Sequence, residues 1–283
     1  MGTLRSVKPA ALADYLIEQG DRVVTTERVA ELLGVRAERV SRSLAVPRRD
    51  KRMLSVTKGL WAPVSAARSA AGTNPPVEYI DEIMSHLGHC YCLGYRSAAA
   101  MYGAAHFGWW DLQVITTARL RSRRLGAWPL VFVTRPDLDQ LPQRTLVRAG
   151  APVRVASPET TVFDLVARPD LALGLSHSAT LVAELLTLDA LDGAALADAA
   201  GLYPAAVVRR GGLLVDRLQS ELGWDMDNPL DLEPLAGYVE ALPQRTVRLS
   251  AGRDSCLRLD NPAEERVDRR WGVLVDMAIE YSL

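Results

Sequence analysis

Residues 25–64, TTERVAELLGVRAERVSRSLAVPRRDKRMLSVTKGLWAPV, decide the fold of the N-terminal part of the chain. A threonine at position 25 or 26 is a suitable helix N-cap, and Val29, Leu32 and Leu33 follow it at helical spacing. Gly34 then predicts a tight turn. The beginning of the stretch is therefore typical of an amphipathic helix that ends in a turn.

A second helix is predicted after this turn, from about residue 37 to residue 46. Its apolar face carries Ala37, Val40 and Leu44. At about 100° per residue, the opposite face carries Glu38, Arg39 and Arg42. A helix with this pattern can rest on a core with one side and offer guanidinium groups to a groove with the other.

Two apolar runs, 53–56 and 60–64, flank the turn Thr57-Lys58-Gly59 and are predicted to pair as a ribbon, with Trp61 folded back onto the core. Two helices followed by such a ribbon make a helix-turn-helix with a wing. From Arg36 to Lys58 there are eight Lys or Arg residues against two acidic ones, a local excess of six positive charges. The pattern favours DNA binding over its two alternatives, a solvated basic surface and a protein–protein module.

We expect the second helix to enter a major groove, with Arg39 and Arg42 reaching base edges and Ser41 or Ser43 reaching a phosphate or a base. The basic residues around it supply backbone contacts, and Lys58 extends from the wing. The complete set of candidate DNA-binding residues is Arg36, Glu38, Arg39, Ser41, Arg42, Ser43, Arg48, Arg49, Lys51, Arg52 and Lys58. Such a module usually gains affinity by pairing or by binding two half-sites in series, so we expect two copies per operator.

Length and charge predict more than one domain. A chain of 283 residues, 48% hydrophobic and 24% charged, suits two or three domains with sizeable cores. Residues 1–66 carry a net charge of +5 and the remainder −6, which suits a protein that meets phosphates at one end only. We predict an α+β fold with a winged helix-turn-helix domain at 1–66, a linker at 67–76 and a mixed α/β domain at 77–283. The C-terminal part of that second domain is helical, and its subdivision near 175–190 is left open.

Helices and strands alternate in the first part of the second domain. Strands are predicted at 90–93, 112–116, 130–134 and 153–156, and helices at 77–87, 97–102 and 160–167, the last begun by Ser157-Pro158. Three helices follow at 179–186, 193–200 and 204–222. In the last of these, Val207, Leu214 and Leu218 are predicted to face inward and Arg209, Arg210 and Arg217 to be more exposed. Further runs at 246–249, 256–259 and 271–278 could be strands of the tail.

Four possible metal ligands, His86, His89, Cys90 and Cys92, lie within seven residues. They lack the C-x2-C spacing and the second ligand pair of a structural zinc site, so we expect no metal. In a strand the two cysteines would point the same way into a core. A total of three cysteines also argues against a disulfide framework.

The sequence offers no positive evidence for catalysis. Asp225-Met226-Asp227 has the spacing of paired magnesium ligands, but no Gly-Ser helix start lies upstream and the pair is interpreted as an acidic loop. No phosphate-binding glycine loop or hydrolase motif is present, and no cofactor is expected.

The interpretation of two other features remains open. Trp109, Trp110 and Trp128 are core residues or a contact patch, and the basic run Arg119, Arg121, Arg123 and Arg124 is a solvated loop or a second phosphate or acidic-partner contact.

The N-terminal sequence has no apolar signal core, and no stretch approaches 18 uninterrupted apolar residues. We therefore expect a cytoplasmic protein that does not enter a membrane.

The order of several short motifs resembles the AbiEi family of antitoxins from bacterial type IV toxin–antitoxin systems, over nearly the whole chain. The motifs are Lys58-Gly59-Leu60-Trp61, Tyr91-Cys92-Leu93-Gly94, Ser97-Ala98-Ala99 with Tyr102-Gly103, the run VASPETTVFDLV at 155–166, Arg209-Arg210-Gly211-Gly212 and Arg270-Trp271-Gly272-Val273. The last 50 residues match loosely.

The resemblance implies two roles. The winged helix would bind inverted repeats in the promoter of its own operon and repress it, and the larger domain would counteract a nucleotidyltransferase-like toxin encoded beside it. Family members act without the stable toxin complex of type II antitoxins, so no toxin-contacting residue is assigned. Two alternatives remain: a winged-helix regulator with a ligand-sensing C-terminal domain, and a DNA-targeted nuclease or nucleotidyltransferase.

Overall fold

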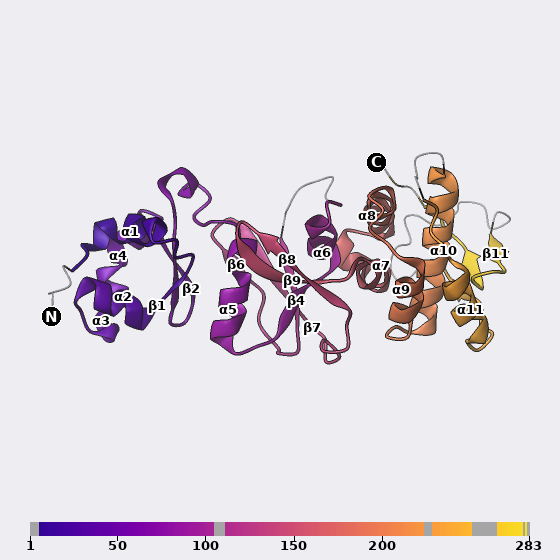
Figure 1. Cartoon of the computed structure of the whole chain (residues 1–283), viewed down its shortest axis with the longest axis horizontal. Helices are drawn as coiled ribbons and strands as arrows, with labels where there is room; N and C mark the ends of the chain where they lie inside the picture. Colours follow the sequence, from indigo (N-terminus) through magenta and orange to yellow (C-terminus); the bar gives the residue numbers. More distant parts are fainter. Residues whose placement is uncertain (1–5, 105–110, 224–227, 251–264, 280, 282–283) are drawn as a thin grey trace. The chain divides into compact units, whose positions relative to one another are not determined.

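The structure of the chain, a computed structural model, describes residues 6–104, 111–223, 228–250, 265–279 and 281 and is of the mixed α/β kind (Figure 1). The chain forms two compact units that are interleaved along the sequence. The first consists of Met1–Cys92, Trp110–Pro136 and Thr145–Arg154, and the second of Leu93–Trp109, Asp137–Arg144 and Val155–Leu283. The linker expected at residues 67–76 lies inside the first unit.

Four short α-helices form the N-terminal part of the first unit (Figure 1). They are α1 (Leu12–Glu18), α2 (Thr26–Leu33), α3 (Ala37–Ser43) and α4 (Ala45–Arg49), preceded by the 3-10 turn η1 (Pro9–Ala11). Thr25 caps α2, because its Oγ1 accepts a hydrogen bond from the Arg28 N–H at 3.3 Å, and Gly34 ends this helix with a φ of +65°. Their inner faces share one core, in which Leu12, Leu16, Val29, Val40 and Leu44 are fully buried.

The helix predicted from residue 37 to residue 46 is in fact two helices, so that prediction was wrong. The first, α3, ends at Ser43, and α4 begins at Ala45. Pro47 provides the physical reason. It has no N–H to donate to the carbonyl of Ser43, four residues earlier, and its ring would clash with that carbonyl in a continuous helix. A proline in the first turn of a new helix carries neither penalty.

The predicted ribbon is present as β2 (Met53–Thr57) and β3 (Leu60–Pro63), which pair antiparallel. Gly59 in the turn between them has a φ of +82°, a conformation that glycine adopts without strain. The two-residue strand β1 (Val24–Thr25) pairs with β3 and completes the sheet order β1-β3-β2. Trp61 folds back as predicted: it is buried, and its Nε1–H donates to Thr26 Oγ1 at 2.9 Å.

A six-stranded sheet has the order β6-β7-β5-β4-β9-β8. Its strands are β4 (Tyr91–Leu93), β5 (Leu112–Thr116), β6 (Arg123–Leu125), β7 (Trp128–Thr134), β8 (Gln143–Arg148) and β9 (Ala151–Ala156). Four of them were expected, and the pairs β5–β7 and β4–β9 are parallel. The two edge strands, β6 and β8, were missed. In β8 every residue except Leu146 is exposed, so no apolar alternation marks it.

The expected linker has contacts of its own within the first unit. It begins within η2 (Ala66–Arg68) and leads into η3 (Pro76–Glu78) and α5 (Ile80–Leu87). Ala71 O accepts a hydrogen bond from the Ala127 N–H, 2.9 Å away in the turn between β6 and β7. Thr73 is buried, with its Oγ1 2.6 Å from the Tyr79 hydroxyl. Burial raises the pKa of that hydroxyl. This segment is therefore anchored to the β6–β7 turn.

The second unit is mainly helical. Its helices are α6 (Tyr95–Met101), α7 (Pro158–Ala167), η4 (Pro169–Ala172), α8 (Leu175–Thr187), α9 (Gly193–Ala200), α10 (Ala205–Leu222) and α11 (Glu233–Ala241). Ser157 caps α7 as predicted, since its Oγ accepts from the Thr160 N–H at 3.2 Å. A small sheet, ordered β10-β12-β11, follows with β10 (Val247–Arg248), β11 (Arg266–Asp268) and β12 (Val273–Val275). Helix α11 and strand β11 were not foreseen, and the run predicted at 256–259 lies outside the described residues.

Two glycines of α10 let large rings pack directly on the helix backbone. A Cβ at Gly211 would lie 2.9 Å from the Phe163 ring, and one at Gly212 would lie 2.2 Å from the ring of Trp271, which is fully buried. Phe163 also contacts Tyr203, with ring centroids 5.1 Å apart. The motif residues at 163, 211, 212 and 271 thus meet in one core, which accounts structurally for their residue types.

Arg209 lies about one turn before Gly212 in the same helix, and its position shows that a second prediction was wrong. It was expected on the exposed face of α10, but only 6% of its surface is accessible. Its guanidinium lies among backbone carbonyls that the sequence places 30 to 62 residues away. Val207, Leu214 and Leu218 are buried, as predicted.

Candidate nucleic-acid interface

Helix α3 presents its arginines to solvent because its opposite side is fixed in the core. Val40 within the helix and Leu44 just after it are both fully buried. Arg39 and Arg42, which lie one turn apart on the other side, are exposed. Arg36 occupies the N-cap position, is also exposed, and its carbonyl accepts a hydrogen bond from the Arg39 N–H at 2.9 Å. The guanidinium groups of Arg39 and Arg42 are therefore free to contact a partner.

Nine of the eleven candidate residues are exposed. They are Arg36, Glu38, Arg39, Ser41, Arg42, Arg48, Arg49, Lys51 and Lys58. Arg49 forms an exposed ion pair with Asp50 at 2.9 Å, a kind of contact that water and salt weaken. The other two residues, Ser43 and Arg52, are half-buried. Most of the set thus forms a solvent-facing basic surface on α3, α4 and the segment after them.

Arg52 is committed to structural contacts instead of facing solvent. Its Nε donates to Val64 O at 2.8 Å, and its Nη2 donates to the carboxylate of Asp14 in α1. These bonds connect the first helix to the end of β3. Arg52 is therefore less available to a phosphate than the sequence pattern suggested.

Arg48 has a neighbour that the sequence did not indicate. Its guanidinium carbon lies 5.8 Å from the centroid of the Trp61 ring, at the outer limit of a cation–π contact. Trp61 thus packs in the core and also lies beside a basic residue. No spacing rule could have revealed this pair, because Arg48 belongs to α4 and Trp61 to β3.

Lys58 lies in the β2–β3 turn with its side chain exposed. Its carbonyl oxygen is 3.0 Å from Nε2 of His86 in α5, within the first unit. The turn is therefore held at its backbone, while the ammonium group remains in solvent.

The other candidate sites have varied outcomes. Cys92 is buried but Cys90, just before β4, is exposed, so the expectation that both point into the core was wrong. Across the described ranges, no group of three or more His, Cys, Asp or Glu side chains could hold a metal ion. Trp109, Trp110 and Asp225-Met226-Asp227 lie outside the described residues, whereas Trp128 is half-buried in β7.

The basic run at 119–124 is only partly the solvated loop of one interpretation. Arg119 and Arg121 are exposed. Arg123 and Arg124 belong to β6, and the Arg123 guanidinium carbon lies 5.8 Å from the Phe132 ring centroid. Burial lowers the pKa of Arg123. Half of the run is thus part of the sheet.

In the part of the chain that the structure covers, no helix has both the length and the apolarity needed to cross a membrane.

No family model and no curated protein matches the sequence significantly. Among solved structures, the chain is similar to that described as the "Crystal structure of RV2827C protein from Mycobacterium tuberculosis". The TM-score is 0.67 at 14% sequence identity, and the match covers 97% of this chain and 94% of the other. At this identity the likeness is one of fold, and the two chains share their architecture over nearly their whole lengths.

Proposed function

We propose that the protein binds double-stranded DNA through its N-terminal helices and ribbon, which act as a winged helix-turn-helix. The observation that carries the proposal is the position of Arg39 and Arg42, both exposed on a helix whose other side is buried. Arginine is the residue that most often reads guanine in the major groove, through paired hydrogen bonds to its edge. An α-helix such as α3 suits this role, because its diameter with side chains, about 10–12 Å, is close to the width of the groove.

The remaining basic residues support the same mode of binding. Arg36, Arg48, Lys51 and Lys58 are exposed around α3 and in the ribbon turn, where phosphate contacts would fix the register of the helix. Two copies would bind the two halves of an inverted repeat.

Two substitutions test this assignment on a duplex that carries the promoter's inverted repeat. Arg42→Ala is expected to weaken binding by about 1–3 kcal/mol and to relax the preference at one base pair. Lys51→Ala is expected to weaken binding to all duplexes alike. Fluorescence anisotropy against specific and scrambled duplexes measures both effects. Arg168→Ala, which removes an exposed arginine paired with Asp170 in the second unit, is the matched control. Wild-type affinity in both test variants would refute the proposal.

The role we propose for the whole protein is that of an antitoxin that represses its own operon and counteracts a nucleotidyltransferase-like toxin. It rests on the resemblance to the AbiEi family, and the order of its motifs is its main support. Several motif residues, including Phe163, Gly212 and Trp271, form a core and not a surface. They therefore argue for a shared fold and leave the toxin-facing residues unassigned.

Co-expression tests this second role separately. The toxin encoded by the adjacent gene is expressed with the wild-type chain or with Arg42→Ala. We expect both chains to restore growth, because counteracting the toxin uses the larger domain, whereas only the wild type should repress a promoter reporter. Growth arrest despite soluble wild-type protein would contradict the antitoxin role and leave the DNA-binding proposal standing.

A further inference from the structure

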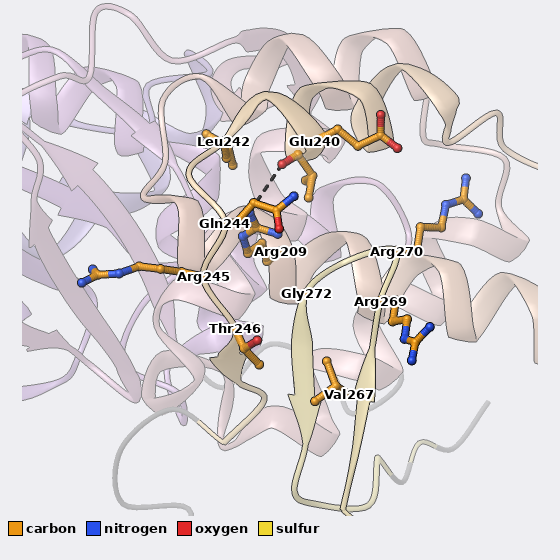
Figure 2. Close-up of a pocket in the computed structure, with 11 residues that line it drawn as sticks. Arg209, Glu240, Leu242, Gln244, Arg245, Thr246, Val267, Arg269, Arg270 and Gly272 are labelled. Carbon is orange, nitrogen blue, oxygen red and sulfur yellow. Dashed lines mark hydrogen bonds between the residues drawn. The ribbon is translucent and has the colours of Figure 1, made fainter.

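A pocket in the second unit contains a cluster of arginines that the proposed function does not use (Figure 2). Its volume is about 420 Å³, within the roughly 300–1,000 Å³ of small-molecule sites. It lies among the end of α11, the segment leading to β10, and the turn between β11 and β12. The lining residues are Arg209, Val239, Glu240, Leu242, Gln244, Arg245, Thr246, Val267, Arg269, Arg270 and Gly272.

The innermost of these arginines is buried without a carboxylate partner. Arg209 Nη1 donates to Trp271 O at 3.0 Å, and Nη2 donates to Val239 O at 3.4 Å and to Pro243 O at 3.2 Å. These bonds use three of the five N–H groups of a guanidinium. Within the described residues no acidic side chain pairs with it, so its charge is balanced only by the dipoles of neutral carbonyls. A buried cation in this state favours an anion beside it.

The rim adds further positive charge. Figure 2 shows Arg245 on one side of Arg209, and Arg269 and Arg270 on the other, with the guanidinium ends of all three directed away from Arg209. Arg270 is already neutralised by Asp216 and Glu233, at 3.4 and 2.8 Å. Arg245 and Arg269 are exposed and form no ion pair with any described residue. The pocket lining contains four arginines and one glutamate, and with the carboxylates of Asp216 and Glu233 that pair with Arg270 the formal charge is +1.

Gly272 keeps the backbone clear of the buried guanidinium. Its φ is +64°, and a Cβ at this position would lie 2.6 Å from Nη1 of Arg209. Any other residue would therefore press on the one charged group at the base of the pocket. The pocket lining contains no aromatic ring on which a base could stack, so the features point to recognition of the anion and not of a nucleobase.

We propose that this pocket binds a small phosphate monoester as its dianion. Guanidinium groups bind phosphate with strong charge-assisted hydrogen bonds, and the net positive charge of the lining favours an anion. Gln244 and Thr246 offer neutral hydrogen-bonding groups to the rest of the ligand, while Val239, Leu242 and Val267 provide apolar surface. The inference is independent of DNA binding, because it uses residues of the second unit only.

The test is a calorimetric titration of the full chain with glycerol 3-phosphate, with glycerol as the uncharged control. We expect saturable binding of one ester per chain and none of glycerol. Because the second ionisation of a phosphate monoester has a pKa near 6, the affinity should fall as the pH drops through about 6. The double variant Arg245→Ala/Arg269→Ala should weaken binding at least about tenfold, since these two exposed side chains would turn inward to donate charge-assisted hydrogen bonds to the anion, and each such bond contributes that much. Both residues are exposed, so the fold should be retained, as circular dichroism would verify.

Two further variants sharpen the result. Glu240→Gln removes the one negative charge of the lining and should tighten binding, an effect that a loss of structure would not produce. Arg119→Ala, an exposed arginine of the first unit, should change nothing. The proposal is overturned if no heat is detected, or if the double variant binds the ester as wild type does. It is also overturned if the double variant loses affinity for a 20-base-pair duplex while glycerol 3-phosphate does not bind, since the arginines would then belong to a DNA surface.

Discussion

Arg209 stabilises the second unit by connecting three segments of backbone. Its hydrogen bonds reach carbonyls in α11, in the segment after it and just before β12. We predict that Arg209→Met lowers the free energy of unfolding by about 2–4 kcal/mol, because the buried carbonyls lose their donors while the packing volume is nearly kept. Urea denaturation measures the change. Arg217→Met, on the half-buried part of the same helix, is the control, and an equal loss in both variants would contradict the prediction.

Glycines at two helical positions of the second unit should respond to alanine in opposite directions. Gly212→Ala places a Cβ 2.2 Å from the buried Trp271 ring and should destabilise the protein by about 2–4 kcal/mol through overpacking. Gly237, exposed in α11, has no neighbouring atom within 4 Å of the position that a Cβ would take, so Gly237→Ala should stabilise by about 0.5–1 kcal/mol through helix propensity. Thermal unfolding of both variants checks the signs. A stable Gly212→Ala protein would mean that Trp271 can move aside.

Single residues show where sequence patterns succeed and where they stop. The helical spacing of apolar residues placed Val40 and Leu44 in the core and Arg39 and Arg42 in solvent. It succeeded because the apolar side of a short amphipathic helix is the side that packs against the core. It failed for Arg209, whose acceptors come from distant segments. The same kind of failure affects Arg52, which is held by Asp14 and by Val64 O. Long-range hydrogen bonds of charged side chains leave no periodic trace.

At the scale of the element, helices and strands with a clear apolar pattern were more predictable than those without one. Strands with apolar residues on both faces, such as β5, were found with their full bounds, because each of their residues is buried. The edge strand β8 was missed because it is almost wholly exposed. Helix α11 was missed because it follows a polar, acidic stretch and begins Glu233-Pro234, a start that is favourable in a helix but also common in loops.

The junction of β10 and β12 depends on one buried carboxylate and should therefore be sensitive to acid. Asp276, 1% exposed, accepts hydrogen bonds from the N–H and Oγ of Ser250, at 2.9 and 2.6 Å, and from Arg248. Burial raises the pKa of the Asp276 carboxyl, but these hydrogen bonds outweigh it and leave the pKa below its ordinary value of 3.8. The folded state thus favours the ionised form. Its stabilisation is present above that value and is lost as the pH falls below it.

We predict that Asp276→Asn lowers stability at neutral pH and makes stability less dependent on pH between about 5 and 2. Urea midpoints measured across this range provide the comparison. Asp198→Asn, an exposed carboxylate in α9, should leave both the midpoint and its pH dependence close to wild type. If Asp276→Asn loses stability with acid as steeply as wild type does, the carboxylate is not the group responsible.

For the whole molecule, composition indicated where charge lies but not how the chain is divided. The first 66 residues carry a net +5 and the rest −6, which the count of side chains gives directly. The interleaved units could not be foreseen, since residues 110–136 and 145–154 join the first unit through contacts between segments far apart in the sequence. Turn-rich composition at 67–76 predicts a linker whether or not the segment is anchored, as Ala71 and Thr73 are.

The charge asymmetry leads to a last prediction, about the salt dependence of DNA binding. If only the N-terminal basic surface meets phosphates, the logarithm of the binding constant should fall linearly with the logarithm of salt concentration, with a slope of about −0.9 per phosphate contact. Lys51→Ala and Lys58→Ala should each make that slope shallower by about 1.

Arg121→Ala decides whether the basic run at 119–124 shares in the contact. Arg121 is exposed, but it lies outside the basic segment 1–66. The part of the chain after residue 66 carries a net negative charge and should repel a duplex. We therefore expect its slope to equal that of wild type in anisotropy titrations from about 50 to 200 mM salt. A shallower slope for Arg121→Ala would extend the interface to the run before β6. An unchanged slope for Lys51→Ala and Lys58→Ala would instead remove the phosphate contacts on which the proposed register of α3 depends.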